Sequence, residues 1–226
     1  ECMDEFKFQE MFPLEAERPE YRRLTGDPVS TARFDGAEIL KVAPEALTLL
    51  ARQAFTDVAH LYRPSHLKLL AQVFEDPESS ANDRYVALEM MKNAVIAAEM
   101  VFPMCQDTGT AIVIGKKGEQ VWTTEDDELA ISRGVFRTFT ETNLRYSQMA
   151  ALDMYREANT GDNLPAQVEL YATKGAEYRF LVLTKGGGSA NKTFLYQETK
   201  ALLNPKSLLA FLDQKTRAPG QEVQRD

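Results

Sequence analysis

Apolar residues recur every three or four positions through the first hundred residues, which is the spacing of helices that turn one face toward a core. Between Pro44 and Pro64 that face holds Leu47, Leu50, Ala54, Val58 and Leu61. A proline suits the first turn of a helix and stops the helix before it, so the pattern predicts a helix between these two prolines. Two more helices are expected: a short one capped by Ser65 and running through Phe74, and one after residue 80 whose apolar face holds Val86, Met90, Ala94, Ala97 and Val101.

The pattern changes from helical to alternating after residue 109. Residues 110–114 and 120–122 predict two strands joined by a four-residue turn, and residues 167–184 predict a clearer hairpin. Before residue 43 the pattern predicts short extended pieces, few of them more than edge strands. Further helices are predicted from Thr124 toward Thr140, from Leu144 to Glu157 and from Lys206 to Arg217. The sequence therefore predicts an α+β fold, with one domain over residues 1–217, in which a helical N-terminal scaffold packs on antiparallel or mixed strands, and a disordered tail over residues 218–226.

Composition and charge disfavour several classes of protein. The chain has 226 residues, of which 44% are apolar and 27% charged, as in a soluble globular protein. Its net charge of −8, without any basic run, disfavours binding to nucleic acid or to anionic membranes. No apolar run approaches the ~20 residues of a membrane span. Two distant cysteines do not make a disulfide framework, which indicates a reducing compartment such as the cytoplasm or the mitochondrial matrix.

A short polar loop is the first candidate for chemistry. Cys105, Gln106 and Asp107 are followed by Gly109, and apolar runs flank the loop on both sides. A thiol beside a carboxylate suits a soft metal and acid–base chemistry, whereas a lone cysteine is otherwise a small buried hydrophobe. An acidic run at residues 125–128 also has two interpretations, a hard-metal site or the first turn of a helix, and its spacing favours the helix.

A glycine run after the last predicted strand is the second candidate. The run and the residues that follow it place several backbone N–H groups and a cation in a small volume: Gly186, Gly187, Gly188, Ser189, Asn191 and Lys192. Such a loop suits an anion, or is otherwise a flexible surface turn, and its spacing is not that of the phosphate loop of nucleotide hydrolases. If it met the Cys105 loop and Arg145, the three segments would offer a carboxylate clamp, a proton carrier and a metal ligand.

Four motifs carry a resemblance to a known family: Pro103-Met-Cys105-Gln-Asp-Thr-Gly-Thr110, Asn143-Leu-Arg-Tyr-Ser-Gln148, Asn163-Leu-Pro-Ala-Gln167 and Lys185-Gly-Gly-Gly-Ser-Ala-Asn-Lys192. In this order they resemble the N-terminal half of the class I fumarate hydratases, the iron–sulfur fumarases. Part of the pattern also resembles the α subunit of tartrate dehydratase. The resemblance implies reversible hydration of fumarate to (S)-malate at a [4Fe–4S] cluster held by three protein thiolates.

The resemblance also implies roles for individual residues. Gln106 and Asp107 would contact the substrate, and Asp107 would carry a proton. Arg145 would clamp a substrate carboxylate, while Gly188 would offer a backbone N–H and Lys192 a cation. We therefore expect these groups to surround one cleft beside the thiol of the first loop.

The cysteines depart from the family pattern. Cys105 would be one cluster ligand, but the family places its second cysteine in a Cys-Pro-Pro-Tyr-His run just after the last predicted helix, and this chain has only Cys2 besides. One thiolate cannot hold a four-iron cluster. We therefore expect the family's N-terminal domain in a truncated or degenerate form, inactive or incomplete alone. The alternatives are a cluster-free dicarboxylate-binding or interaction domain and a tartrate dehydratase-like hydro-lyase. A homodimer is expected, because a domain without its other half exposes apolar surface.

Overall fold

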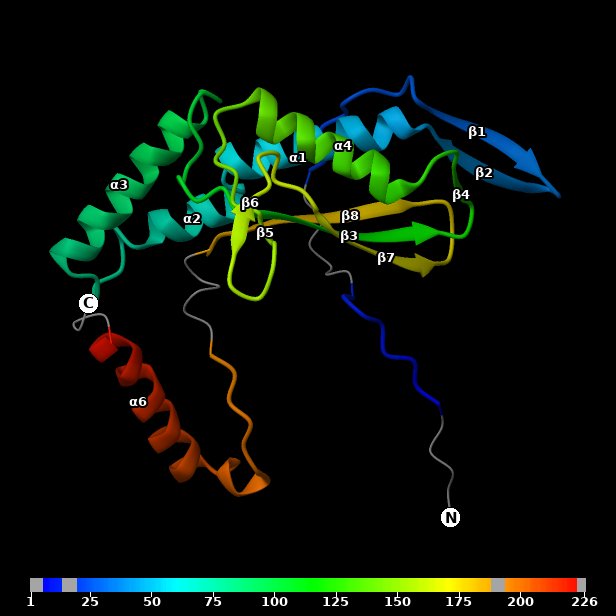
Figure 1. Cartoon of the computed structure of the whole chain (residues 1–226). Coiled ribbons are helices and arrows are strands. Elements are labelled where there is room, and N and C mark those ends of the chain that lie inside the picture. The colour runs from blue at the N-terminus through cyan, green and yellow to red at the C-terminus, as the bar shows by residue number, and fades with distance from the viewer. Residues whose placement is uncertain (1–5, 14–19, 188–193, 223–226) are drawn as a thin grey trace, which may run out of the picture.

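The computed structural model describes residues 6–13, 20–187 and 194–222, and its elements are shown in Figure 1. The α-helices are α1 (Pro44–His60), α2 (Pro64–Gln72), α3 (Ala81–Ala97), α4 (Asp127–Glu141) and α6 (Pro205–Glu222), with a short 3₁₀ helix η1 (Lys200–Leu202). The strands are β1 (Val29–Phe34), β2 (Ala37–Val42), β3 (Thr110–Gly118), β4 (Val121–Thr123), β5 (Met149–Ala151), β6 (Glu157–Asn159), β7 (Gln167–Thr173) and β8 (Tyr178–Lys185). This mixture of helices and separate sheets confirms the predicted α+β class.

Helices α1 and α4 pack against each other and cover one face of the β7-β3-β8 sheet (Figure 1). The shared core holds Phe55 from α1 and Val135 and Phe139 from α4, all almost completely buried. Helix α1 begins at Pro44 as predicted, since proline fits the first turn. Its fully buried face is shifted one position from the predicted stripe, onto Leu47, Ala51, Phe55 and Ala59, and the predicted Leu50, Ala54 and Val58 are half-buried.

Strand β3 lies at the centre of this sheet, parallel to β7 and antiparallel to β8. Strands β7 and β8 therefore flank β3 and do not pair with each other, so the predicted hairpin over residues 167–184 is wrong. The predicted pairing of residues 110–114 with 120–122 is also wrong, because β3 continues to Gly118 and β4 joins β2 in another sheet. The physical reason is burial. Ala111 and Val113 are buried apolar residues, and a strand with a neighbour on each edge keeps such residues away from water.

The second sheet has the order β1-β2-β4. Strands β1 and β2 form an antiparallel hairpin whose turn, Asp35-Gly36, has positive φ angles of 48° and 79°, which asparagine, aspartate and glycine tolerate best. Strand β2 pairs on both edges, with β1 and with β4, so it is one of the few pieces before residue 43 that is more than an edge strand. Its Ile39 and Val42 are buried, which again explains the central position.

The helix predicted from Leu144 to Glu157 is wrong. Residues in this range form the antiparallel pair β5 and β6 instead. The Asp153 side chain accepts hydrogen bonds from the backbone N–H groups of Tyr155 and Arg156, at 2.9 Å each. Such local bonds compete with the helical ladder and favour a turn.

The other helix predictions need smaller corrections. Helix α2 begins at Pro64 with Arg63 at its N-cap position, so Ser65 does not cap it. Helix α4 is capped by Asp126, two residues after the predicted start at Thr124. In α3 the predicted apolar face is wrong in part: Ala97 is buried and Ala94 half-buried as expected, but Val86, Met90 and Val101 are exposed. Ala87, which was not predicted, is buried, and α2 packs on this helix.

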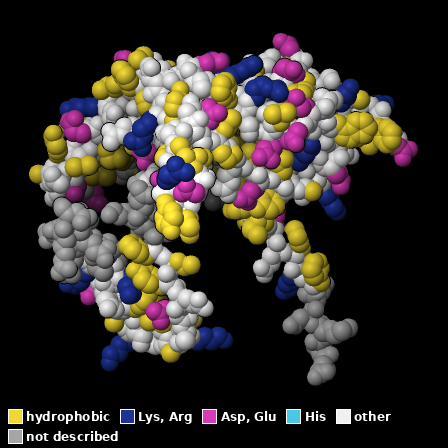
Figure 2. All heavy atoms as spheres, viewed as in Figure 1, with side chains coloured by type: hydrophobic (Ala, Val, Ile, Leu, Met, Phe, Trp, Pro, Cys, Tyr) yellow, Lys and Arg dark blue, Asp and Glu magenta, His cyan; other side chains and the backbone are white. Residues whose placement is uncertain are grey.

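The C-terminal segment lies apart from the body of the molecule (Figure 1). Helix α6 continues past Arg217 to Glu222, into the segment predicted to be a tail, and residues 223–226 lie outside the described part of the chain. The ring of Tyr196 packs edge-on against Phe211 at 5.5 Å and ties the preceding extended segment to the helix. Hydrophobic side chains remain on the surface of this segment (Figure 2), including Leu195, Leu203 and Leu209.

Candidate functional site

The Cys105 loop connects α3 to β3 and is held at its base by backbone contacts. The Met104 N–H donates to the carbonyl of Ala59 at 2.9 Å, and the Asn93 side chain donates to the carbonyl of Met104 at 2.8 Å. The thiol of Cys105 is free and the residue is exposed, as is Gln106 beside it. The interpretation of Cys105 as a small buried hydrophobe is therefore wrong, and its sulfur is accessible to a ligand.

Asp107 and Arg145 form an ion pair. The Arg145 Nη2 lies 2.7 Å from Asp107 Oδ1, although the two residues are 38 positions apart in the chain. The hydroxyl of Ser147 donates to the same carboxylate oxygen at 3.4 Å. The Asp107 side chain is 22% exposed and that of Arg145 56%, so the pair lies at the surface and a solute can reach it. A guanidinium in this position offers a planar set of donors to a further carboxylate.

The glycine run begins directly against this ion pair. A Cβ atom at Gly186 would lie 2.6 Å from Asp107 Oδ2, closer than any side chain tolerates. At Gly109 the φ angle is +76°, and a Cβ there would lie 2.7 Å from the carbonyl carbon of Lys185. Glycine is therefore required at position 109, where the neighbour is backbone, whereas a side chain at position 186 would displace the Asp107 carboxylate.

The predicted site residues thus divide into three groups. Asp107, Arg145 and the start of the glycine run at Gly186 meet in one place, and Cys105 and Gln106 lie exposed in the residues just before Asp107. Gly188 and Lys192 lie outside the described residues, as does Cys2.

Two further residues contribute to the site and were missed by sequence reasoning. Ser147 contacts Asp107, and the buried Asn163 bonds to the backbone around Ser147. Both lie inside the motifs already singled out, in the segments 143–148 and 163–167. In the sequence each appears only as a short polar residue within a motif. Their partners lie in other segments of the chain, and the sequence does not show which segments meet.

A second polar cluster lies at the other end of β3. Lys117 Nζ lies 2.6 Å from Asp127 Oδ2, and the Tyr178 hydroxyl donates to the same oxygen at 2.9 Å. Burial alone would raise the pKa of the Asp127 carboxyl, but the hydrogen bonds led by that from Lys117 outweigh it and hold this pKa below its usual range. Burial, together with Asp127, raises the pKa of the Tyr178 hydroxyl well above its usual range. The acidic run at residues 125–128 therefore serves a helix start and a structural ion pair.

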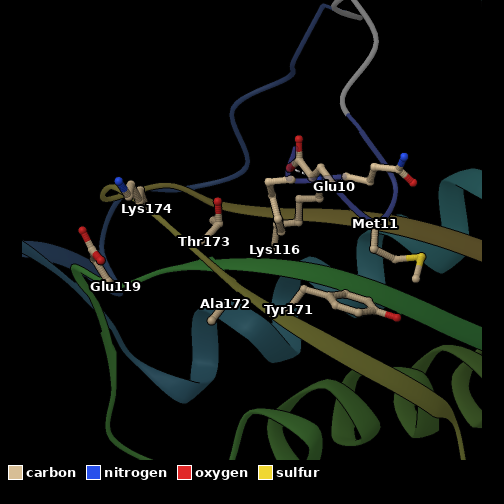
Figure 3. Close-up of a pocket in the computed structure, with 10 residues that line it drawn as sticks. Glu10, Met11, Lys116, Glu119, Tyr171, Ala172, Thr173 and Lys174 are labelled. Atoms are coloured by element: carbon tan, nitrogen blue, oxygen red, sulfur yellow. Dashed lines mark hydrogen bonds and ion pairs between the residues drawn. The ribbon is translucent and has the colours of Figure 1, made fainter. Parts of the chain in front are cut away.

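A cavity of about 800 Å³ lies elsewhere (Figure 3). It is bounded by the N-terminal arm, residues 8–11, and by the end of β7, with Tyr171 and Lys116 on its floor. Lys116 forms an ion pair with Glu10 of the arm. None of the predicted site residues lines this cavity, so its size does not mark it as the functional site.

The comparisons with known proteins agree with the motifs. The family model described as fumarate hydratase (Fumerase) matches residues 48–222. The chain belongs to this family. It is 60% identical over 215 residues to the anaerobic class I fumarate hydratase of Escherichia coli and 59% identical to the aerobic one of Salmonella typhimurium. Each match covers 95% of the chain but only 39% and 37%, respectively, of the relative.

A more distant relative is the putative L(+)-tartrate dehydratase subunit alpha of Methanocaldococcus jannaschii. It is 29% identical over 141 residues, which are 61% of this chain and 50% of the relative. Among the helices of the described residues, none is both long enough and apolar enough to cross a membrane.

The donor groups of this chain do not fit a complete iron–sulfur cluster. Such a cluster is held by several cysteine thiolates, and the chain has two cysteines in all. Within the described ranges, no group of three or more His, Cys, Asp or Glu side chains is placed to hold a metal ion. Cys105 can therefore supply at most one ligand of a shared set.

Proposed function

We propose that this chain supplies the carboxylate-binding and proton-transfer groups of a hydro-lyase that interconverts fumarate and (S)-malate. The observation that carries the proposal is the Arg145–Asp107 ion pair at 2.7 Å, with Gly186 packed against the same carboxylate. Three segments far apart in the chain thus bring a cation, a carboxylate and a glycine backbone to one exposed place. A dicarboxylate substrate requires donors for its charged ends and a group that exchanges a proton with carbon.

Arg145 is the group we assign to a substrate carboxylate. Its guanidinium has five N–H donors, and the bond to Asp107 runs through Nη2. Because the Arg145 side chain is 56% exposed, a substrate carboxylate can reach the guanidinium without prior movement of the fold. From the family resemblance, the backbone N–H of Gly188 and the ammonium of Lys192 also bind the substrate, and Gln106 contacts it with its side-chain amide.

Asp107 is the group we assign to proton transfer. In the dehydration of malate its carboxylate takes a proton from the carbon next to the one that loses hydroxide, and in hydration it returns that proton. The bonds from Arg145 and Ser147 both reach Oδ1, so they fix the direction in which the carboxylate points. From the resemblance, Cys105 would supply one thiolate of a [4Fe–4S] cluster, and such a cluster would offer a Lewis acid to the oxygens of the substrate.

Titration calorimetry of the chain with fumarate and with (S)-malate tests this assignment. Arg145→Met removes a charged donor, which corresponds to a loss of affinity of about 10- to 100-fold. Arg156→Met is the matched control, because Arg156 is also an exposed arginine paired with an aspartate, Asp153, but in the β5–β6 turn. Equal affinities of both variants and the unchanged chain, or no binding by the unchanged chain, would contradict the proposal.

A second candidate function is a tartrate dehydratase-like reaction, which the relative from Methanocaldococcus jannaschii favours. The ion pair suits any short dicarboxylate, so competition between fumarate and L-tartrate in the same titration separates the two substrates. A third possibility, a cluster-free dicarboxylate-binding domain, is separated from the first by iron and sulfide analysis of anaerobically purified protein.

We also infer a homodimer that acts in the cytoplasm or the mitochondrial matrix. The homodimer is supported by the exposed apolar side chains of the C-terminal segment, such as Leu195 and Leu209. Light scattering at increasing protein concentration tests it, and a monodisperse monomer throughout would contradict it.

A further inference from the structure

Asn163 is a fully buried polar residue that forms hydrogen bonds to the backbone of the site loops. None of its surface is exposed, and its φ angle of +61° lies in the left-handed region, which asparagine tolerates better than most residues. Its Oδ1 accepts from the backbone N–H of Ser147 at 2.6 Å and from that of Gln148 at 3.0 Å. Its Nδ2 donates to the carbonyl of Gly109 at 3.0 Å.

These three bonds join the segment before β7 to both loops of the ion pair. The two loops are also joined to each other: the Thr108 hydroxyl donates to the carbonyl of Arg145 at 2.7 Å, and the Gly109 N–H donates to the Ser147 hydroxyl at 3.2 Å. Asn163 bonds to one residue of the first loop and to two of the second, so it fixes the distance between their backbones.

Ser147 connects Asn163 to the side chains of Asp107 and Arg145. Its backbone N–H is held by Asn163, while its hydroxyl contacts both Gly109 N–H and Asp107 Oδ1. Arg145, two residues before Ser147, pairs with that same oxygen. A displacement of this loop therefore changes the approach of the guanidinium to the carboxylate.

We propose that Asn163 is a positioning residue that sets the Arg145–Asp107 geometry and thereby the affinity for a dicarboxylate. The proposal rests on the proposed function for the ligand, but the geometric part stands on the bonds alone. Because Asn163 is buried, no water replaces its side chain without entering the core, and its loss leaves three backbone groups without their partner.

Asn163→Gly tests the proposal, since glycine keeps the left-handed backbone and removes the three bonds. Asn159→Ala is the matched control: the Asn159 side chain donates to the carbonyl of Tyr146 at 2.9 Å, on the same loop, but it is exposed and does not reach Gly109. Two readouts are used: fumarate affinity by calorimetry, and the NMR signal of the Arg145 Nε–H group.

In Asn163→Gly we expect fumarate affinity to fall about 10- to 100-fold. We also expect the Arg145 signal to move toward that of an exposed arginine, with faster amide exchange at Ser147 and Gln148. The control keeps wild-type values in every readout. Asn163→Asp, which keeps the acceptor oxygen but cannot donate to Gly109 when ionised, restores the protection of Ser147 and Gln148 in part.

The outcomes separate the proposal from the proposed function. Wild-type affinity together with a wild-type Arg145 signal in Asn163→Gly overturns the positioning role. If the unchanged chain binds no fumarate, the proposed function fails, and the Arg145 signal alone decides the positioning role. If Asn163→Gly does not fold, the same two readouts in Asn163→Asp decide, and wild-type values there overturn the proposal.

Discussion

The closest contact between α1 and α4 depends on Gly134. A Cβ atom at this position would lie 2.4 Å from the carbonyl oxygen of Thr48 and 2.6 Å from the Cβ of Ala51. The first of these is a backbone atom of the facing helix, so it cannot move aside by a change of rotamer. Gly134→Ala therefore forces the two helices apart.

The size of the effect follows from opposing terms. Alanine favours the helix over glycine by about 1 kcal/mol. Overpacking of a helix interface costs about 1–3 kcal/mol. Separation of the helices also weakens two hydrogen bonds between them, from the Thr48 hydroxyl to the Ala130 carbonyl at 2.8 Å and from the Thr138 hydroxyl to the Arg52 carbonyl at 3.0 Å, each with a net contribution of about 1 kcal/mol. The expected net destabilisation is about 2–4 kcal/mol.

Thermal unfolding followed by circular dichroism measures this change. For a chain of 226 residues, each kcal/mol lowers the Tm by about 2–4 °C, so Gly134→Ala lowers it by about 4–16 °C. Ser132→Ala, in the same helix and half-buried, is the control and should leave the Tm unchanged or slightly higher. A Gly134→Ala variant as stable as the unchanged chain would show that the helices do not approach each other as closely as described.

Two further predictions concern the two ion pairs. Gly186→Ala displaces the Asp107 carboxylate, because the added Cβ would lie 2.6 Å from Oδ2. Calorimetry should show that fumarate affinity falls about tenfold while the Tm changes little. Unchanged affinity would argue against the site. The lowered pKa of Asp127 means that its ionised form stabilises the fold above the unfolded pKa of about 3.9 and that this stability is lost as the pH falls through the folded value. Tyr178→Phe removes a hydrogen bond that lowers the pKa of Asp127, so acid unfolding should begin at a higher pH. The free energy of unfolding at pH 7 should fall by about 1–2 kcal/mol. An unshifted acid transition would contradict the role of Tyr178.

The helices were more predictable from the sequence than the strand pairings. Helix α1 begins at Pro44 and α2 at Pro64, because a proline acts on a helix within a few positions of the chain, although the predicted cap at Ser65 was wrong. In β8 the alternation places Phe180 and Val182 against the core, whereas in β7 only Val168 of the alternating apolar residues packs there and Leu170 is exposed. The alternation did not predict that β3 lies between these two strands, because the period of two specifies the faces of a strand but not its neighbours.

The candidate site was also predictable only in part. The sequence predicted that the Cys105 loop, Arg145 and the glycine run would meet, and the structure brings Asp107, Arg145 and Gly186 together. That expectation came from the order of four motifs and not from the spacing of the residues themselves. The contribution of Asn163 was not predictable, because it acts on backbone groups of other segments and needs both a buried position and a left-handed backbone.

Two ion pairs between an aspartate and a basic residue lie at opposite ends of β3, and they differ in how far their carboxylates are exposed. The Lys117–Asp127 pair has an aspartate side chain that is 7% exposed and accepts hydrogen bonds from Lys117 and Tyr178, so little of its carboxylate is open to a ligand. The Arg145–Asp107 pair has an aspartate that is 22% exposed and an arginine that is 56% exposed, so water already competes for its donors. Breaking the second pair therefore costs little stability, and under the proposed function the bonds of a substrate carboxylate to the guanidinium would compensate for that cost. Burial, rather than residue type, separates the structural pair from the one suited to binding.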